Sequence, residues 1–391
     1  MSKTEMPSIR FHGFEDAWEQ RKLGDLATEF KSGDNLKSDK ITVIGKYPVY
    51  GGNGLRGYTD CFNHNGEFAL IGRQGALCGN VNFSRGKAYF TEHAVAVKAN
   101  STNNTLFLYY MLGNMNLRQY SGQSAQPGLA VNKLVGLFSF VPGKDEQQQI
   151  GAFFYTLDNL ITLHQRKFEK LTNVKKSMLE KMFPKDGADV PEVRFKGFTD
   201  AWEQRKFSDL VETRRGLTYK PTDIREKGVR VLRSSNIVED RFVLKPDDVF
   251  VNESAINIDF AKENDILITA ANGSSRLVGK HAIVSEISDK STVHGGFMLL
   301  GTSDEPYFAN AFMSSAWYKR FIDLYVSGGN GAIGNLNKSD LDDQDILVPQ
   351  KKEQQAIGHF FENLDHLITL HQRELEKLQS IKKALLEKMF V

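Results

Sequence analysis

The sequence predicts an α+β protein with two globular domains in a pseudo-two-fold arrangement, joined by two long coiled-coil helices. Two observations indicate this fold: two different segments each occur twice along the 391-residue chain, and the stretches between them diverge. The length allows at least two hydrophobic cores, because single domains usually hold about 100 to 200 residues. Two copies are too few for a solenoid, which needs about three stacked units.

The longer repeat predicts the helices. Residues 141–184 return as residues 348–391, and the first copy has neither Gly nor Pro between Gly151 and Pro184. Apolar residues recur every seven residues over about five heptads, which is typical of a coiled coil. The expected scaffold positions are Ile150, Phe154, Leu157, Ile161, His164 and Leu171 in the first copy, and Ile357, Phe361, Leu364, Ile368, His371 and Leu378 in the second.

Polar residues interrupt these apolar seams at equivalent places. His164 and His371 occupy one seam, and Lys175 and Lys382 lie in the neighbouring seam. Polar seam residues lower stability but disfavour slipped registers, so we interpret all four as register-setting residues. Coupled histidine ligands are the functional alternative.

The shorter repeat is FEDAWEQRKLGDL at 14–26 and FTDAWEQRKFSDL at 198–210. Asp16 and Glu19 have the spacing of a capping box, which predicts that a helix begins there. Each copy carries one tryptophan that we expect to be a packing anchor, with recognition as the alternative: Trp18 and Trp202.

The divergent bodies, 27–140 and 211–347, alternate β-rich runs with polar loops. Strands are expected at 67–72, 89–97, 265–271 and 281–286, and helices at 105–119 and 307–326. The predicted division of the chain is 1–140 for the first domain, 141–192 for the central helix and linker, 193–347 for the second domain, and 348–391 for the C-terminal helix.

Composition excludes several classes of protein. The chain has no long apolar run and no signal peptide at its start, so we expect a cytoplasmic protein. Cys61 and Cys78 are too few for a disulfide framework, and both are expected to be packing residues. The net charge of +2 is small, with about +5 in the first body and about −4 in the second, so any contact with nucleic acid must be local.

No motif indicates catalysis or a bound cofactor. GNGLRG (52–57) and GNGAIG (329–334) fit a dinucleotide-binding pattern but lack the strand and helix that the pattern needs, and GSSRLVGKH (273–281) has the wrong P-loop spacing. Neither a methyltransferase tetrapeptide nor a metal-binding histidine pair nor a nuclease carboxylate cluster is present in the sequence. We therefore expect no enzymatic activity, no metal and no cofactor in this chain.

The body loops carry groups that suit base edges and phosphates. Arg can bind guanine, Asn and Gln can bind adenine, and Gly lets the backbone approach a phosphate. The candidates in the first body are Arg73, Gln74, Asn80, Asn82, Arg85, Lys87, Gln123, Gln126 and Asn132. Those in the second body are Arg214, Arg215, Tyr219, Lys220, Arg233, Ser234, Asn236, Asn272, Ser274, Arg276 and Lys280.

Nearly the whole chain resembles the specificity subunit of type I restriction-modification systems. The resemblance rests on the repeat order and on local phrases: WEQRK at the start of each half, FALIGRQGALCGNV in the first body, and VPxxxEQQxIG before each long helix. It implies that each body is a target-recognition domain that reads one half of a bipartite, asymmetric sequence in double-stranded DNA. The resemblance also implies that the two long helices form an antiparallel coiled coil, which would set the length of the spacer between the half-sites.

The resemblance also implies partners. Two adenine-N6 methyltransferase subunits would use S-adenosylmethionine, and two motor-nuclease subunits would use ATP and magnesium, while this chain binds no cofactor itself. Three alternatives are an independent enzyme, a coiled-coil adaptor whose bodies bind protein, and a specificity subunit for a fused methyltransferase-nuclease. The half-sites and the spacer length do not follow from the sequence.

Overall fold

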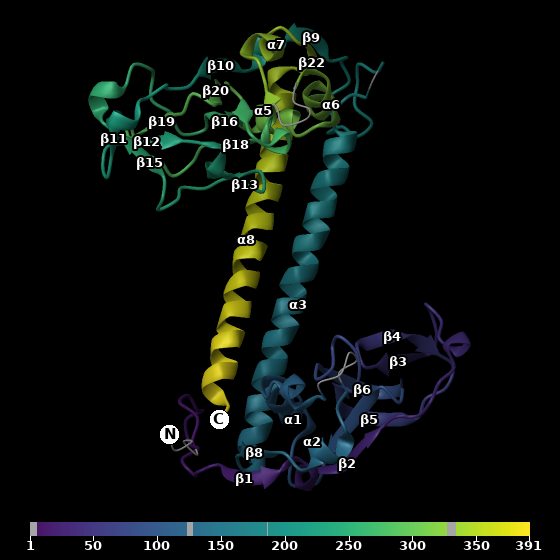
Figure 1. Ribbon diagram of the computed structural model, residues 1–391. Helices are drawn as coiled ribbons and strands as arrows, with labels where there is room; N and C mark the ends of the chain where they lie inside the picture. The colour runs from purple at the N-terminus through teal and green to yellow at the C-terminus, as the bar shows by residue number, and fades with distance from the viewer. Residues whose placement is uncertain (1–5, 123–127, 186, 327–333) are drawn as a thin grey trace. The chain divides into compact units, whose positions relative to one another are not determined.

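The computed structural model describes residues 6–122, 128–185, 187–326 and 334–391. The chain forms two compact units, Met1–Arg166 with Gln372–Val391 and Lys167–His371. Each unit therefore contains one body, the beginning of one long helix and the end of the other (Figure 1). The two helices are α3, Lys144–Lys181, and α8, Lys351–Met389, so both predicted long helices are confirmed.

Within each unit the two helices run antiparallel and are joined by an ion pair. In the first unit Lys382 Nζ lies 2.5 Å from Asp158 Oδ1, and in the second Lys175 Nζ lies 2.5 Å from Asp365 Oδ1. The two aspartates occupy the same repeat position, as do the two lysines. The duplication thus makes the two contacts equivalent, and each predicted seam lysine has a carboxylate partner on the opposite helix.

The helix ends close the core of each unit. Phe390, just after α8, packs on Phe154 at 5.9 Å between ring centroids in the first unit. Phe183, just after α3, packs on Phe361 at 6.1 Å in the second. Predicted scaffold positions are fully buried near the start of each helix and half-buried beyond: the buried ones are Ile150, Phe154, Leu157, Ile357, Phe361 and Leu364, and the half-buried ones are Ile161, His164, Leu171, Ile368, His371 and Leu378.

The shorter repeat forms a strand, and the predicted helix beginning at Asp16 is wrong. Strand β1, Glu19–Lys22, pairs antiparallel with β8, Phe138–Val141, while β9, Glu203–Lys206, pairs in the same way with β22, Asp345–Val348. Each of these two-stranded ribbons leads directly into a long helix. The strand before each helix needs a partner for its backbone groups, and this demand outweighs a local capping signal. Only single helical turns follow, at η1, Leu23–Leu26, and α4, Phe207–Leu210.

The two tryptophans are packing anchors, as predicted. Trp18 is buried with its ring 6.0 Å from Phe107 and 6.3 Å from Phe390. Trp202 is buried in the same way, 6.0 Å from Phe183 and 6.2 Å from Phe308. Each tryptophan therefore ties the short repeat to the body and to the end of a long helix.

A buried ion pair fixes the start of each long helix. Arg10 Nε and Nη2 donate to the two carboxylate oxygens of Glu146 at 2.9 and 2.7 Å. Arg194 makes the same forked contact with Glu353, at 2.7 Å for both bonds. Hydrogen bonding to Glu146 raises the pKa of Arg10, so the guanidinium stays protonated. The glutamate of the EQQ phrase therefore has a structural role.

The first body is built on a six-stranded sheet in the order β2-β7-β5-β6-β3-β4. The predicted strand at 89–97 is interrupted by a turn at 91–93, and GNGLRG lies in the hairpin of β3 and β4, as expected of a polar turn. Cys78 is buried, whereas Cys61 is exposed and is not a packing residue. The elements are β2 Ala27–Ser32, β3 Tyr47–Gly51, β4 Gly54–Thr59, β5 His64–Gly72, β6 Val81–Phe90, β7 Ala94–Ala99, α1 Thr105–Asn114, η3 Leu117–Tyr120 and α2 Val131–Val135.

The second body contains two four-stranded sheets, ordered β10-β20-β16-β18 and β11-β15-β12-β19. The sheet strands are β10 Glu212–Arg215, β11 Ile224–Arg225, β12 Val229–Leu232, β15 Val249–Val251, β16 Ile266–Thr269, β18 His281–Ile283, β19 Thr292–His294 and β20 Met298–Thr302. Two short pairs, β13 Ile237–Val238 with β14 Arg241–Phe242 and β17 Ala271–Asn272 with β21 Gly334–Asn335, complete the strands. The helices are α5 Pro306–Met313, α6 Ala316–Tyr325 and α7 Lys338–Asp342.

Candidate nucleic-acid interface

In the first body the two predicted reading segments meet at one end of the β5–β6 hairpin. Gln74 forms an isolated bridge with Gly128, and the backbone NH of Leu129 donates to the carbonyl of Arg73 at 2.9 Å. The Arg73 side chain is half-buried and donates from Nη1 to Ser32 Oγ at 3.3 Å. Gln74 and the nearby Asn80 are exposed. Two segments about fifty residues apart in the sequence therefore lie side by side.

The remaining candidates of this body lie elsewhere. Asn82 is half-buried early in β6. Arg85 and Lys87 are exposed toward the other end of the hairpin, where the Arg85 guanidinium lies 2.8 Å from Glu67 and 5.0 Å above the Tyr155 ring, and the Lys87 ammonium lies 4.7 Å above the Phe62 ring. Asn132 is exposed on α2, and two candidates fall outside the described residues: Gln123 and Gln126.

In the second body four candidates line one cleft of about 670 Å³. They come from three separate stretches of the chain: Tyr219, Arg233, Ser234 and Asn272. Asn272 Nδ2 donates to Ser234 Oγ at 3.0 Å, which orients both side chains. Within the described residues the buried Nε of Arg233 has no hydrogen-bond partner, so this cleft-lining residue retains one unused donor.

A second cleft of about 420 Å³ adjoins the first and shares four of its lining residues. Its polar lining includes Arg215, Asn335, Asn337 and Lys338. Of the other predicted residues, Lys220, Ser274 and Arg276 are exposed and Lys280 is half-buried, and none of them lines either cleft.

Two predicted reading residues take part in buried polar contacts. Asn236 is 0% exposed: its side-chain amide donates to the Val243 carbonyl and to Asp248, and its oxygen accepts from the Arg233 backbone. Arg214 Nη2 lies 3.0 Å from the buried carboxylate of Asp265. Asn236 has no surface to offer DNA, and breaking the Arg214 pair would leave a buried charge alone. The sequence could not distinguish these side chains from exposed loop residues of the same type.

An exposed aromatic ring that was not predicted from the sequence also lines these clefts. Phe297 lines both clefts of the second body and is 70% exposed. The available signal was GGF at 295–297, directly after a buried strand. Phenylalanine side chains are usually buried, so an exposed ring that borders two polar clefts is a candidate contact residue.

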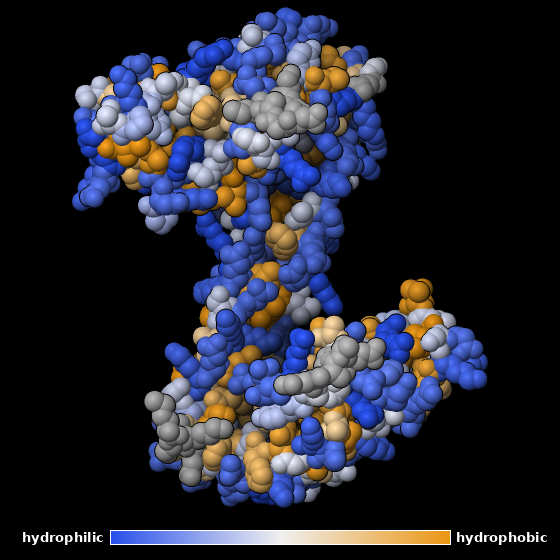
Figure 2. Space-filling model, in the orientation of Figure 1, coloured by the Kyte–Doolittle hydropathy of each residue, from blue (hydrophilic) through white to orange (hydrophobic). Residues whose placement is uncertain are grey.

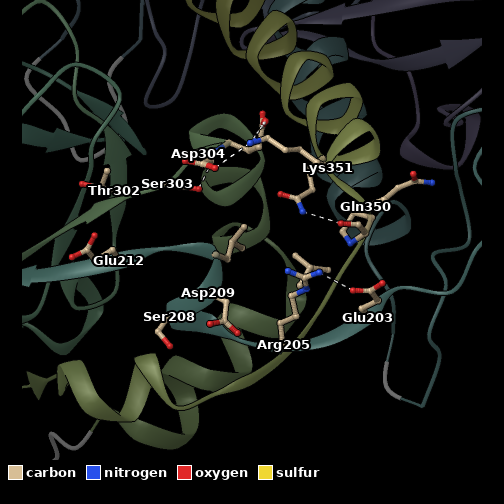
Figure 3. A pocket seen from close by; sticks show the side chains of 15 residues that line it. Glu203, Arg205, Ser208, Asp209, Glu212, Thr302, Ser303, Asp304, Gln350 and Lys351 are labelled. Carbon is tan, nitrogen blue, oxygen red and sulfur yellow. Dashed lines mark hydrogen bonds and ion pairs between the residues drawn. The ribbon is translucent and has the colours of Figure 1, made fainter.

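A third cleft lies on the repeated scaffold of the second unit (Figure 3). It measures about 570 Å³ and is formed by β9, the turn after it, the end of β20 and the start of α8. Both of its cations are paired, with Arg205 2.8 Å from Glu203 and Lys351 3.0 Å from Asp304, but five carboxylates line the cleft against these two cations. Hydrogen bonding to Asp304 raises the pKa of Lys351. Across the described ranges, no group of three or more His, Cys, Asp or Glu side chains is arranged to hold a metal ion.

The long helices also expose apolar residues in duplicate. Leu160 and Leu163 of α3 are 41% and 46% exposed, and their counterparts Leu367 and Leu370 of α8 are 40% and 45% exposed. Residues three apart lie on the same face of a helix, so each pair forms a small apolar patch. Figure 2 shows hydrophobic residues reaching the surface along the helices. In the described part of the chain, no helix is long and apolar enough to cross a membrane.

The chain therefore belongs to the class of proteins in which a duplicated helical scaffold carries two different globular bodies. The sequence matches the family described as Type I restriction modification DNA specificity domain over residues 15–173 and again over 199–380. These two matches cover most of the chain, so the protein belongs to the family of type I restriction-modification specificity subunits, and DNA target recognition is the family's function.

Individual relatives agree with this assignment. The chain is 53% identical over 150 residues to the EcoprrI specificity subunit of Escherichia coli, a match that spans 37% of each protein. It is 21% identical over 413 residues to the MjaIX specificity subunit of Methanocaldococcus jannaschii, covering 95% of this chain and 92% of that one. The fold matches the crystal structure of the type I S subunit from M. genitalium with a TM-score of 0.71, 17% identity and 99% coverage of both chains.

Proposed function

We propose that this chain recognises a bipartite, asymmetric DNA target, with each body reading one half-site. The observation that supports this most directly is the contrast between duplicated scaffold and divergent bodies: the repeats build equivalent ion pairs and anchors in both units, whereas the bodies differ in sheet topology and in the side chains they expose. Unlike surfaces on equivalent supports suit two different half-sites. The chain itself positions the DNA and carries out no chemistry on it.

The proposed contacts fall into two groups. In the first body they centre on Arg73, Gln74 and Asn80, and in the second on Arg215, Tyr219, Arg233, Ser234 and Asn272. Arginine and asparagine can discriminate guanine and adenine through paired hydrogen bonds, each worth about 1–3 kcal/mol against the wrong base. Arg85, Lys87, Lys220, Arg276 and Lys280 are proposed to contact phosphates, which strengthens binding without reading sequence. Asn82 and Ser274, which have short polar side chains, are also proposed to contact DNA.

We also propose that the repeated scaffold docks two copies of one adenine-N6 methyltransferase subunit. The support is the pair of matching apolar patches, one made by Leu160 and Leu163 and the other by Leu367 and Leu370. Identical patches in two units suit two identical partners. The methyltransferase would supply S-adenosylmethionine, and two motor-nuclease subunits would supply ATP and magnesium chemistry to the complete assembly.

The test is to co-express the chain with the adenine methyltransferase encoded beside it and to map N6-methyladenine across a genome. We expect a bipartite motif that disappears when this chain is omitted. The mass of the purified assembly should correspond to one copy of this chain and two of the methyltransferase. A folded, associated assembly that methylates without any motif would refute sequence recognition, and a single methyltransferase copy would refute the paired docking.

A further inference from the structure

The two bodies share one tight turn, although the residues that form it differ between the two sequences. In the first body it is Thr91–His93, between β6 and β7, and in the second Gly295–Phe297, between β19 and β20. Four backbone hydrogen bonds hold the first turn, each from NH to carbonyl: Asp34 to Phe90 at 3.0 Å, Thr91 to Tyr50 at 2.9 Å, Arg73 to His93 at 2.9 Å and Ala94 to Thr91 at 2.9 Å. Four equivalent bonds hold the second: Leu217 to His294 at 2.7 Å, Gly295 to Leu232 at 2.9 Å, Ala270 to Phe297 at 2.9 Å and Met298 to Gly295 at 2.8 Å.

A glycine packs against this turn in both bodies. A Cβ on Gly33 would lie 2.1 Å from the Phe90 carbonyl oxygen, and one on Gly216 would lie 2.0 Å from the Gly295 carbonyl oxygen. No other residue type allows so close a backbone approach. The turn is therefore held rigidly by the same contacts in two bodies that otherwise differ, which pre-organises whatever side chains it carries.

The side chains on this common backbone are different. The first turn carries Thr91, Glu92 and His93, and the His93 side chain is 42% exposed with Nε2 3.2 Å from the Glu92 carboxylate. The second turn carries two glycines and Phe297, whose ring is 70% exposed. The equivalent tip thus offers a hydrogen-bonding imidazole in one body and a bare aromatic ring in the other.

The surroundings of Phe297 suit a DNA groove. Arg233 and Asn272 line one of the two clefts that Phe297 borders, and Arg215 and Lys338 line the other, where Lys338 is paired with Asp342. Cationic groups can meet phosphates or guanine, while an apolar ring has a distinct partner among base edges, the 5-methyl group of thymine. This local arrangement is basic even though the body as a whole carries a net negative charge.

We propose that this turn is the specificity-determining element of each recognition domain, with Phe297 contacting a thymine methyl group in one half-site and His93 hydrogen-bonding a base edge in the other. The inference rests on the proposed function and deepens it, because it places one discriminating side chain at the same backbone position in both bodies. Phe297 and His93 are outside the residues that the sequence analysis selected.

The test uses the assembly of this chain with its methyltransferase and a duplex carrying the mapped motif. Thymines of each half-site are replaced one at a time by deoxyuridine, which removes only the methyl group. One replacement should weaken binding by wild-type protein about fivefold, and Phe297→Ala should bind thymine and uracil duplexes equally at that position. Phe297 is exposed, so the substitution leaves the core intact. Uracil replacements that never change binding, or that change it equally in Phe297→Ala, would overturn the thymine contact.

Matched variants separate this turn from other exposed residues. Leu324→Ala removes an 80% exposed apolar side chain on α6, outside both clefts, and should bind like the wild type. His93→Ala should relax base preference in the other half-site only. If the wild-type assembly has no sequence preference, the proposed function fails together with this inference. A wild-type preference that survives both Phe297→Ala and His93→Ala overturns the inference alone.

Discussion

At the residue scale, burial decides what a polar side chain does in this protein. His294, in β19 directly before the turn Gly295–Phe297, is 1% exposed, and a ring nitrogen, Nε2, donates to the Arg214 carbonyl at 3.1 Å. Burial lowers its pKa from 6.5 to about 4, because the charged imidazolium would lose its water. Asn236 is likewise fully buried, whereas Arg233 and Asn272 are half-buried and line the cleft.

This histidine should make the second unit sensitive to acid. Because its folded pKa lies below its unfolded value, the unfolded state takes up the proton first, and stability is lost as pH falls from about 6.5 toward 4. The expected loss is on the order of 3 kcal/mol over that window. Denaturant unfolding across the window should show a flatter pH profile for His294→Gln than for the wild type. Buried His281 is unchanged in both proteins, so parallel profiles would contradict the assignment.

At the element scale, the ion pairs between α3 and α8 specify how the helices align. The duplicated sequence places an aspartate and a lysine at fixed positions in each helix, and antiparallel packing brings the lysine of one against the aspartate of the other. A slip of either helix by one turn would separate both pairs. Apolar heptads alone would tolerate such a slip better, so the charges favour one register.

Reversing one charge should reveal this role. Asp365→Lys would place two ammonium groups face to face and lower the free energy of unfolding by about 1 kcal/mol, a modest value because both side chains are partly exposed. Adding Lys175→Asp should restore most of the loss in a double-mutant cycle. The equivalent cycle at Asp158 and Lys382 provides an internal comparison and should give a similar coupling energy. If the two substitutions change the free energy of unfolding additively, the ion pairs do not determine the register of the helices.

At the scale of the whole molecule, the chain is organised so that each body is held by both ends of the scaffold. The start of α3 and the residues after α8 belong to the first unit, and the start of α8 and the residues after α3 belong to the second. The body between these supports contributes its own sheet and its own exposed turn. A body is therefore replaceable as a unit, provided that its strand and helix contacts with the scaffold are kept.

We predict that exchanging residues 27–140 for the corresponding body of another specificity subunit changes one half of the methylated motif. The other half should stay as it was, because the second body and its clefts are untouched. Methylome mapping of the chimaera in complex with the methyltransferase measures both halves at once. A motif that changes in both halves would show that the bodies do not read independently. The predicted domain boundary at 140 is tested by the same chimaera.

The sequence by itself determined the duplicated plan of this protein. Seven-residue periodicity predicted α3 and α8, the repeats predicted equivalent supports, and the phrases at Trp18 and Glu146 indicated the family. These features are readable because helical periodicity and repetition are local properties of a chain. The alternation of strands and helices in the bodies was also largely predictable, apart from the turn that divides the expected strand at 89–97.

Only the tertiary structure decided which of the predicted reading residues are exposed and which are buried. Capping-box spacing at Asp16 predicted a helix, but pairing with β8 made a strand, because backbone hydrogen bonding to a distant segment outweighed the local signal. Asn236 and Arg233 are three residues apart in similar loop sequence, yet one is buried and the other lines a cleft. The turn shared by the two bodies, Thr91–His93 and Gly295–Phe297, has no common sequence, because long-range backbone hydrogen bonds define it. Burial and long-range pairing depend on which segments meet, and that information is spread over the whole chain.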